Sequence, residues 1–286
     1  MPAHTRPTAI QARGIDLTPQ PEYAPHFTLK DGFARPDMDW LRQNFRLLVG
    51  APAFGGNVTS YYHQSYCKLK EACLREGIVC DEFQPVNESD IHRGRNLIAA
   101  GFYHATQYTD LLFWDVDEDV SFEHILMMKA CNLSIVGGLI PLKGIDWDRI
   151  AKIVNRQDRK FTGDELSVLG NNYAINPEPQ AEQMNGCLSR THIGTGLMLI
   201  QRRVVECLVA SGNHDWYDNL PAQFPFKKAW QLFPGTVVNH QIMSEDYSFC
   251  HAWGKLGGRV WCYPHGSFGH WGGYMFRGQP VSKIVV

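Results

Sequence analysis

Two aspartates, separated by a single residue, stand at the end of an apolar run. Asp115 and Asp117 follow Leu111-Leu112-Phe113-Trp114, and both carboxylates point to the same side because side chains alternate along an extended chain. Neighbouring carboxylates repel each other unless a cation or hydrogen bonds offset their charge. Oxygen ligands of this kind suit a hard divalent cation. The pattern therefore predicts a metal site, with an acidic solvated loop or helix start as the alternative.

A group of basic and amide side chains precedes the apolar run. Arg93, Arg95 and Asn96 stand at the beginning of an expected helix. Guanidinium groups and the unpaired backbone N–H groups of a helix start both attract anions. An anion site beside a metal site favours a diphosphate ligand. A pair of ordinary surface arginines is the alternative.

Three more features with potential chemistry lie in the second half of the chain. Glu245 and Asp246 follow Ser244, so they either supply a base for a hydroxyl group or simply stabilise a helix start. His270 lies in a turn rich in glycine and aromatic residues, where a neutral imidazole could complete a metal site. The segment Gly194-Thr195-Gly196 permits close backbone approach, but G-x-G-x-x-G, the dinucleotide-binding pattern, is absent.

These residues need an α/β framework to bring them together. The hydrophobic pattern predicts strands at 45–49, 78–83, 110–114, 133–140, 191–200 and 259–263. It predicts helices at 62–73, 90–105, 122–129, 204–208 and 245–256. The segments 155–186 and 213–238 and the tail from residue 264 read as loops. Alternating strands and helices imply parallel pairing, and such sheets bind ligands at the carboxyl ends of their strands.

Composition narrows the class of protein. The 286 residues include 44% hydrophobic ones, enough for a full core, and the formal charge is −2, which argues against binding a nucleic-acid backbone. The beginning of the sequence lacks the apolar run of a secretory signal, and no stretch is long enough to span a bilayer. Eight cysteines without a C-x-x-C pair indicate buried, reduced thiols and a cytoplasmic protein. We expect an N-terminal arm at 1–43 and a single domain at 44–286.

The order of these features resembles that of the GT-A glycosyltransferases. Members of this superfamily use nucleotide sugars and have a Rossmann-like, mostly parallel central sheet flanked by helices and a D-x-D motif. The resemblance covers roughly residues 45–275, and its most specific part is Arg95-Asn96 followed by the segment from Leu111 to Asp117. It implies that the chain has the same fold and is a hexosyl- or pentosyltransferase.

The resemblance also assigns residues to roles. It implies an Mn²⁺ or Mg²⁺ site made by Asp115, Asp117 and His270, and a catalytic pair of Glu245 and Asp246, with Asp246 as the base of an inverting reaction. Donor contacts, for which a UDP-sugar is favoured, are implied for Pro52, Ala53, Arg93, Arg95, Asn96, Asp115 and Val116. The acceptor would be a glycan, a protein or another hydroxyl compound, recognised by the loops at 155–186 and 213–243.

Several alternatives stay open. A nucleotidyltransferase also needs carboxylates and a metal, but its first loop is usually basic, whereas Phe54-Gly55-Gly56-Asn57 carries no Lys or Arg. A non-catalytic sugar- or nucleotide-binding module of the same fold would bind no metal and would turn over no donor. A retaining reaction would not need Asp246 as base, and modified DNA stays open as an acceptor.

Overall fold

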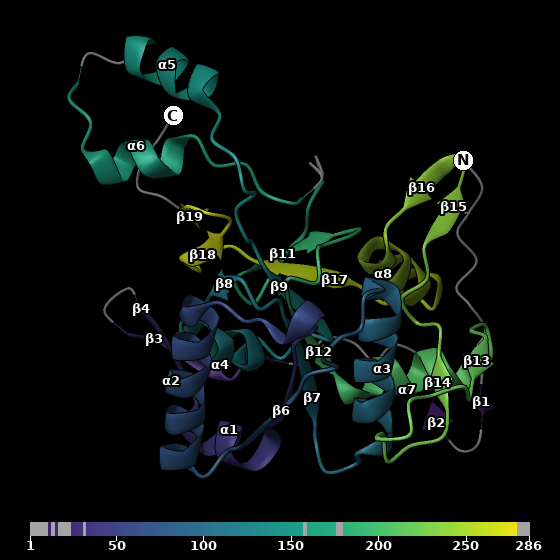
Figure 1. Ribbon diagram of the computed structural model, residues 1–286. Coiled ribbons are helices and arrows are strands. Elements are labelled where there is room, and N and C mark those ends of the chain that lie inside the picture. The colour runs from purple at the N-terminus through teal and green to yellow at the C-terminus, as the bar shows by residue number, and fades with distance from the viewer. Residues whose placement is uncertain are drawn as a thin grey trace.

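A mixed α/β sandwich forms the centre of the molecule (Figure 1). The computed structural model describes residues 11–12, 15–16, 24–30, 33–156, 159–175 and 180–278. Its central sheet has eight strands, in the spatial order β10 (Gln183–Met184), β11 (Cys187–Arg190), β17 (Val260–Tyr263), β9 (Ile135–Gly138), β12 (Leu197–Gln201), β7 (Asp110–Trp114), β5 (Arg46–Gly50) and β6 (Val79–Phe83).

Most strands of this sheet run in one direction. The pairs β5–β6, β5–β7 and β9–β17 are parallel, and β12 and β11 run antiparallel to their neighbours on both sides. Six of the eight strands therefore point the same way. The α/β fold class with a mostly parallel, Rossmann-like sheet flanked by helices is confirmed.

Helices cover both faces of the sheet. One face packs against α1 (Met38–Asn44), α2 (Ser60–Glu76) and α4 (Phe122–Ala130), and the other against α3 (Ile91–His104), α7 (Arg202–Ala210) and α8 (Glu245–Lys255). Strand β7 is buried along its whole length. Leu112 and Trp114 face the first layer, whereas Leu111 and Phe113 face the second, which explains the continuous apolar run in the sequence.

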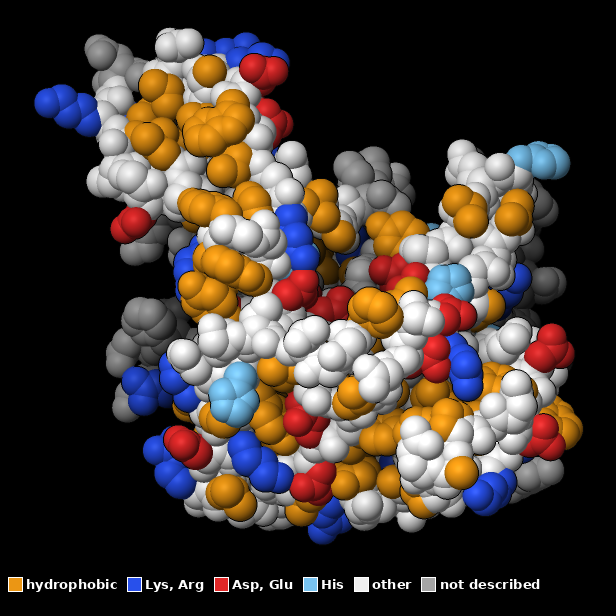
Figure 2. All heavy atoms as spheres, viewed as in Figure 1, with side chains coloured by type: hydrophobic (Ala, Val, Ile, Leu, Met, Phe, Trp, Pro, Cys, Tyr) orange, Lys and Arg blue, Asp and Glu red, His pale blue; other side chains and the backbone are white. Residues whose placement is uncertain are grey.

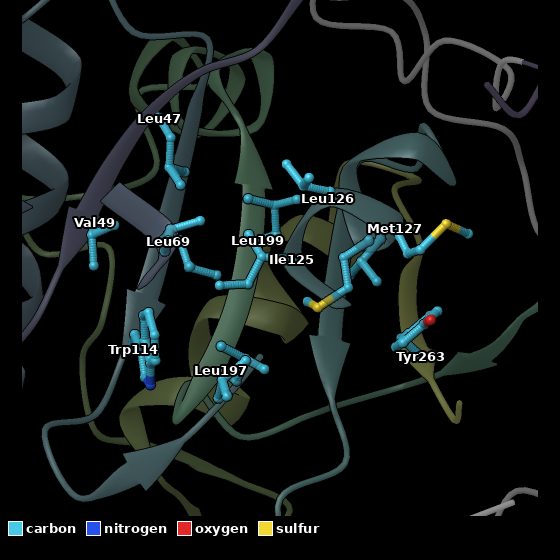
Figure 3. Close-up of a cluster of buried hydrophobic side chains, with 14 of the residues drawn as sticks. Leu47, Val49, Leu69, Trp114, Ile125, Leu126, Met127, Leu197, Leu199 and Tyr263 are labelled. Carbon is cyan, nitrogen blue, oxygen red and sulfur yellow. The ribbon is translucent and has the colours of Figure 1, made fainter. Parts of the chain in front are cut away.

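The two core layers hold the sheet in place. Figure 3 shows the layer beneath α2 and α4, in which Leu47 and Trp114 of the sheet meet Leu69 of α2 and Ile125 of α4. Each such side chain is fully withdrawn from water, and full burial stabilises the fold by roughly 1.5–3 kcal/mol per large apolar side chain. The position of the β7 end is therefore fixed by the core on both faces.

Smaller elements surround the carboxyl end of the sheet. A three-stranded sheet joins β8 (Glu118–Asp119), β18 (Phe268–Trp271) and β19 (Met275–Gly278). The pair α5 (Trp147–Arg156) and α6 (Gly163–Leu169) and the hairpin β15 (Thr236–Val238)–β16 (Gln241–Met243) rise as two protrusions on that side (Figure 1). The remaining short elements are β1 (Gln11–Ala12), β2 (Ile15–Asp16), β3 (Phe27–Lys30), β4 (Phe33–Pro36), η1 (Phe54–Gly56), β13 (Trp216–Tyr217) and β14 (Ala229–Trp230).

Four of the expected loops and strands are wrong, and one of them, the loop expected at 213–238, contains the short strands β13, β14 and β15. The segment 155–186 contains α6 and the end of α5, and α6 begins with a capping box in which Thr162 and Glu165 exchange hydrogen bonds. The tail from residue 264 contains β18 and β19, because the glycines there allow close packing against β8 rather than a loop. The strand expected at 191–200 begins only at Leu197.

The N-terminal part of the described chain packs against the core. The His26 N–H donates to the Ala130 carbonyl at 2.7 Å, and Leu41 of α1 is fully buried. The division at residues 43 and 44 stays a prediction, and most of residues 1–23 lie outside the described part.

All eight cysteines are free thiols, and only Cys67 is not fully buried. None of the helices in the described segments combines the length and apolar character that a bilayer crossing requires.

Candidate functional site

The acidic segment after β7 is held from three sides. The Asp115 N–H donates to the Gly196 carbonyl at 2.8 Å, which ties the strand end to the start of β12. The Val116 carbonyl accepts from the N–H and hydroxyl of Thr59, the cap residue of α2. Asp117 accepts a backbone hydrogen bond from Trp271 in β18 at 2.7 Å. These bonds fix the carboxylates where a ligand would approach the sheet.

Arg95 links three elements at this site. It lies on the first turns of α3, and its side chain is almost entirely buried. Nη2 donates to both oxygens of Asp115 at 3.2 and 3.3 Å, and Nε donates to Glu245 of α8 at 3.3 Å. Nη1 reaches the Thr195 carbonyl at 3.3 Å. The predicted residues Arg95, Asp115 and Glu245 therefore meet in one ionic network.

Asp117 faces a different set of partners. Its carboxylate contacts the Lys143 ammonium, and its Oδ1 lies 3.6 Å from His270 Nε2. Burial raises the pKa of Asp117, but the hydrogen bonds and charges of His270 and Lys143 outweigh burial, so the pKa ends below its usual range. Asp117 is therefore ionised at neutral pH and carries its negative charge between two nitrogen groups.

Glu118 is the most deeply buried acid of the segment 115–119. Burial and the charges of Asp115 and Asp117 raise its pKa well above its usual range, despite the opposing effect of Arg95. Its Oε2 has no hydrogen-bond partner among the described residues, and its carboxyl lies against Gly196, where a Cβ atom would come within 2.1 Å of Oε1. The glycine thus makes room for a fully buried carboxyl group behind Asp115 and Asp117.

Asp246 lies at the beginning of α8, next to Glu245. Its Oδ1 accepts from the Ser244 hydroxyl and from the Tyr247 N–H. Its Oδ2 lies beside Gly194, 3.6 Å from where a Cβ atom of that residue would stand. One oxygen therefore fixes the carboxylate, and the other faces the segment that leads into the site.

The other residues with a predicted donor role lie apart from this network. Arg93 is half exposed and pairs with Glu88 at 3.2 Å. Asn96 is buried, and its Oδ1 accepts from the Phe233 N–H at 2.8 Å. Pro52 and Ala53 follow β5 on the opposite side of α3, where Pro52 lies close to Gly94. The predicted donor-binding residues at the start of α3 therefore point in different directions.

The Asp117 and His270 pair fits a divalent cation better than the full predicted set does. No cluster of three or more His, Cys, Asp or Glu side chains in the described segments is arranged to hold a metal, because Asp115 is turned toward Arg95. His270 Nδ1 lies 2.8 Å from the Pro141 carbonyl, so Nε2 is the ring nitrogen that faces Asp117. Mg²⁺ commonly takes one or two protein ligands and completes its shell with phosphate oxygens and water. Asp117 and His270 are therefore the two members of the predicted metal set that face each other, and Asp115 does not join them.

Comparison with known proteins adds little to this picture. No family model and no curated protein matches the chain. The structure of A197 from STIV aligns with a TM-score of 0.45 and 13% identity over 79% of this chain and 86% of that one. A glycosyltransferase involved in the glycosylation of the major capsid of PBCV-1 aligns with a TM-score of 0.29 and 12% identity, over 64% of this chain and 72% of that one. Both TM-scores are low, so neither likeness informs on the activity of this chain.

Two residues of the site escaped the sequence analysis as individual candidates. Lys143 lies beyond β9, and its aliphatic chain packs against Gly272, so only the fold brings its ammonium to Asp117. Glu118 stands in the acidic run, but nothing in its neighbours marks it as the buried member. The hollow between the two protrusions contains exposed Asp and Glu side chains on the face that Figure 2 shows.

Proposed function

We propose that the protein is a glycosyltransferase that moves a sugar from a nucleotide-sugar donor, with a UDP-sugar favoured, to a hydroxyl group of an acceptor. The observation that carries the proposal is the ionic network at the carboxyl end of β7. There Asp115, Arg95 and Glu245 meet, and Asp117 faces His270. Such a network places fixed positive and negative groups where a donor diphosphate would lie in an α/β sheet.

The cations of the site suit a departing diphosphate. An Mn²⁺ or Mg²⁺ ion, when bound, would be held by Asp117 and His270 and would neutralise charge on the phosphates. The Lys143 ammonium contacts the Asp117 carboxylate, and it can move from this carboxylate to a phosphate oxygen. Arg95 holds the Asp115 carboxylate in place, so that it can accept hydrogen bonds from donor hydroxyl groups.

Asp246 is better suited to act as the base than Glu245. Glu245 is paired with the permanently charged Arg95 and is largely buried, whereas Asp246 is fixed by one oxygen only. In the proposed reaction the acceptor oxygen attacks the anomeric carbon, the bond to the diphosphate breaks, and Asp246 takes the hydroxyl proton. Attack opposite the leaving group inverts the configuration at that carbon.

One feature favours a non-catalytic nucleotide- or sugar-binding module instead. Arg95 and Lys143 pair with the two acids of the D-x-D motif, and a site that only holds the fold together would have the same pairs. A nucleotidyltransferase is less favoured, because the loop after β5, which includes η1, carries no basic residue.

The test compares two aspartates that stand two positions apart. Asp117→Asn removes the charge that faces His270, whereas Asp119→Asn changes a carboxylate that binds Ser65 and Arg277 instead. We expect a UDP-sugar with Mn²⁺ to raise the melting temperature of the wild type and of Asp119→Asn but not of Asp117→Asn. Release of UDP should fall at least about 100-fold in Asp117→Asn, the usual scale for loss of a charge-stabilising group.

The outcome separates the two functions. If a nucleotide sugar shifts the melting temperature of the wild type but no UDP is released, the non-catalytic binding module replaces the glycosyltransferase; if no nucleotide sugar shifts it, with or without metal, the glycosyltransferase is contradicted. If donors bind but Asp117→Asn turns them over normally, the chemistry lies elsewhere in the molecule.

A further inference from the structure

A second polar cavity lies on the other side of α3. It has a volume of about 470 Å³, within the roughly 300–1,000 Å³ typical of small-ligand sites, and it lies between the start of α3 and the segment 217–235. Its polar lining comes mainly from Asp90, His92, Asn96, Tyr217, Asn219 and Gln231.

Helix geometry separates this cavity from the carboxylate site. Successive side chains of a helix point about 100° apart, so Asn96 and Arg95 leave α3 in different directions. Arg95 contacts Asp115 and Glu245, whereas Asn96 lies next to Phe233 and lines the cavity together with His92, one turn earlier. One helix therefore serves two adjacent sites with opposite faces of its first turns.

One buried polar atom in the cavity wall, the Tyr217 hydroxyl, has no partner in the described part of the chain, and the oxygen of a neighbouring amide is already used. The Tyr217 hydroxyl is shielded from solvent and has no hydrogen-bond partner among the described residues. Asn96 is 5% exposed, and its carbonyl oxygen is used by the Phe233 N–H, which leaves its NH₂ group as a donor. An unpaired buried polar group costs about 1–3 kcal/mol, so this wall favours a ligand with hydroxyl groups.

The charges around the cavity argue against an anion. Arg93, the guanidinium at the rim, is paired with Glu88 at 3.2 Å, and Asp90 adds a further carboxylate. Burial raises the pKa of Tyr217, although Arg93 opposes this, so its hydroxyl stays protonated and can donate. A phosphate would meet the Asp90 carboxylate in the wall and an arginine that is already paired with Glu88, whereas a neutral ligand avoids that repulsion.

The aromatic residues argue against a flat base. Phe233 is fully buried, and its ring stacks on Phe249 with a centroid distance of 4.3 Å and an interplanar angle of 5°. Its edge-on neighbour Phe113 lies 5.1 Å away. The ring therefore belongs to the core and offers no face for stacking, while the amides of Asn219 and Gln231 offer donors and acceptors in pairs.

We propose that this cavity binds an uncharged sugar ring through the Tyr217 hydroxyl and the amides of Asn96, Asn219 and Gln231. Binding of such a sugar does not depend on the transferase activity. The further step, that this sugar is part of the acceptor, rests on the proposed function, and it would make the acceptor a glycan.

The test measures sugar binding without donor or metal. The probes are methyl glycosides of common hexoses and simple disaccharides, observed by saturation-transfer NMR with the full chain. Tyr217→Phe removes only the hydroxyl and Asn219→Ala removes one amide, whereas Tyr274→Phe removes a hydroxyl from an exposed tyrosine outside the cavity. We expect one sugar to bind the wild type and Tyr274→Phe equally, and each cavity variant to weaken binding about fivefold, the effect of one lost hydrogen bond.

Stability gives a readout that a merely structural tyrosine would not share. Because the Tyr217 hydroxyl lacks a partner, Tyr217→Phe should leave the free energy of unfolding unchanged or raise it when no sugar is present. A clear loss of stability would contradict the unpaired hydroxyl. If no probe binds the wild type, or if both cavity variants bind as the wild type does, the cavity is not a sugar site.

The two proposals fail separately. Sugar binding to a wild-type protein that turns over no donor, with or without metal, would support the cavity site and contradict the transferase. Donor turnover without any sugar binding in the cavity would do the reverse.

Discussion

Arg95 is the residue on which the geometry of the carboxylate site depends. Its buried guanidinium serves Asp115 and Glu245 together, so removing it would leave two carboxylates without their shared cation. Breaking a buried ion pair from one side costs about 3–5 kcal/mol, and the partial exposure of Asp115 reduces this figure. We therefore expect Arg95→Met to lower the free energy of unfolding by roughly 3 kcal/mol in urea titrations.

A matched control stands two positions earlier in the same helix. Arg93 is also paired with a glutamate, but its side chain is 43% exposed. Because exposed ion pairs contribute only about 0–1 kcal/mol, Arg93→Met should change stability by less than about 1 kcal/mol. Equal losses in the two variants would mean that burial of Arg95 does not matter.

The burial of His124 makes the free energy of unfolding depend on pH. Burial lowers its pKa, the charge of Glu123 opposes this and that of His265 adds to it, and its Nε2 accepts from the Ser267 N–H at 3.3 Å. The unfolded chain, with a histidine pKa near 6.5, therefore binds a proton more readily than the folded one. The contribution of His124 is complete above pH 7 and is lost as the pH falls below 6.5 toward the folded pKa.

The prediction is tested with a residue that accepts a hydrogen bond but does not titrate. We expect His124→Gln to lose less stability than the wild type between pH 7.5 and 5, measured by urea titration. Other titrating groups are common to both proteins and cancel in the comparison. An identical pH dependence in both would show that His124 titrates alike in the folded and unfolded states.

Among the elements, those with a clear hydrophobic period were predictable from the sequence. The apolar run of β7 and the three- and four-residue spacing in α2 and α3 gave the correct element and nearly the correct ends. β18 was missed because Gly269 and the glycines around it indicate a turn, whereas here glycine allows Met275 and Asp119 to approach the strand. Hydrophobic patterns in the sequence therefore predict burial well but predict close backbone packing poorly.

Helix α6 was missed although its signal stands in the sequence. Thr162 and Glu165 form the T-x-x-E pattern of a capping box, just before a short apolar segment. We expect Thr162→Ala to cost about 1 kcal/mol locally, which corresponds to an approximately fivefold faster hydrogen exchange of the α6 amides. The α2 amides, capped by the unchanged Thr59, serve as the reference in the same sample. Unchanged exchange in α6 would show that packing rather than the cap holds this helix.

At the scale of the whole molecule, the sequence indicated which residues meet at the candidate site but not how they pair. Arg95 and Asp115 stand 20 positions apart, and adjacent elements of an α/β unit were expected to bring them close. The partners Lys143 and Glu118 depend on where β9 and β8 lie in the finished fold, and no local pattern encodes that. The sequence also did not show which residues lie on which face of α3. Asn96 was predicted to contact the sugar donor, whereas its Oδ1 accepts a hydrogen bond from the Phe233 N–H.

The link between Arg95 and Glu245 has a consequence for the protein during its synthesis. These residues are 150 positions apart, so a ribosome working at roughly 5–20 residues per second needs about 8–30 s to proceed from one to the other. Arg95 and Asp115 therefore lack this partner until residue 245 has been added, and β17, which lies still later in the chain, joins the sheet only after that. The ionic network of the candidate site therefore assembles only when nearly the whole chain has been made.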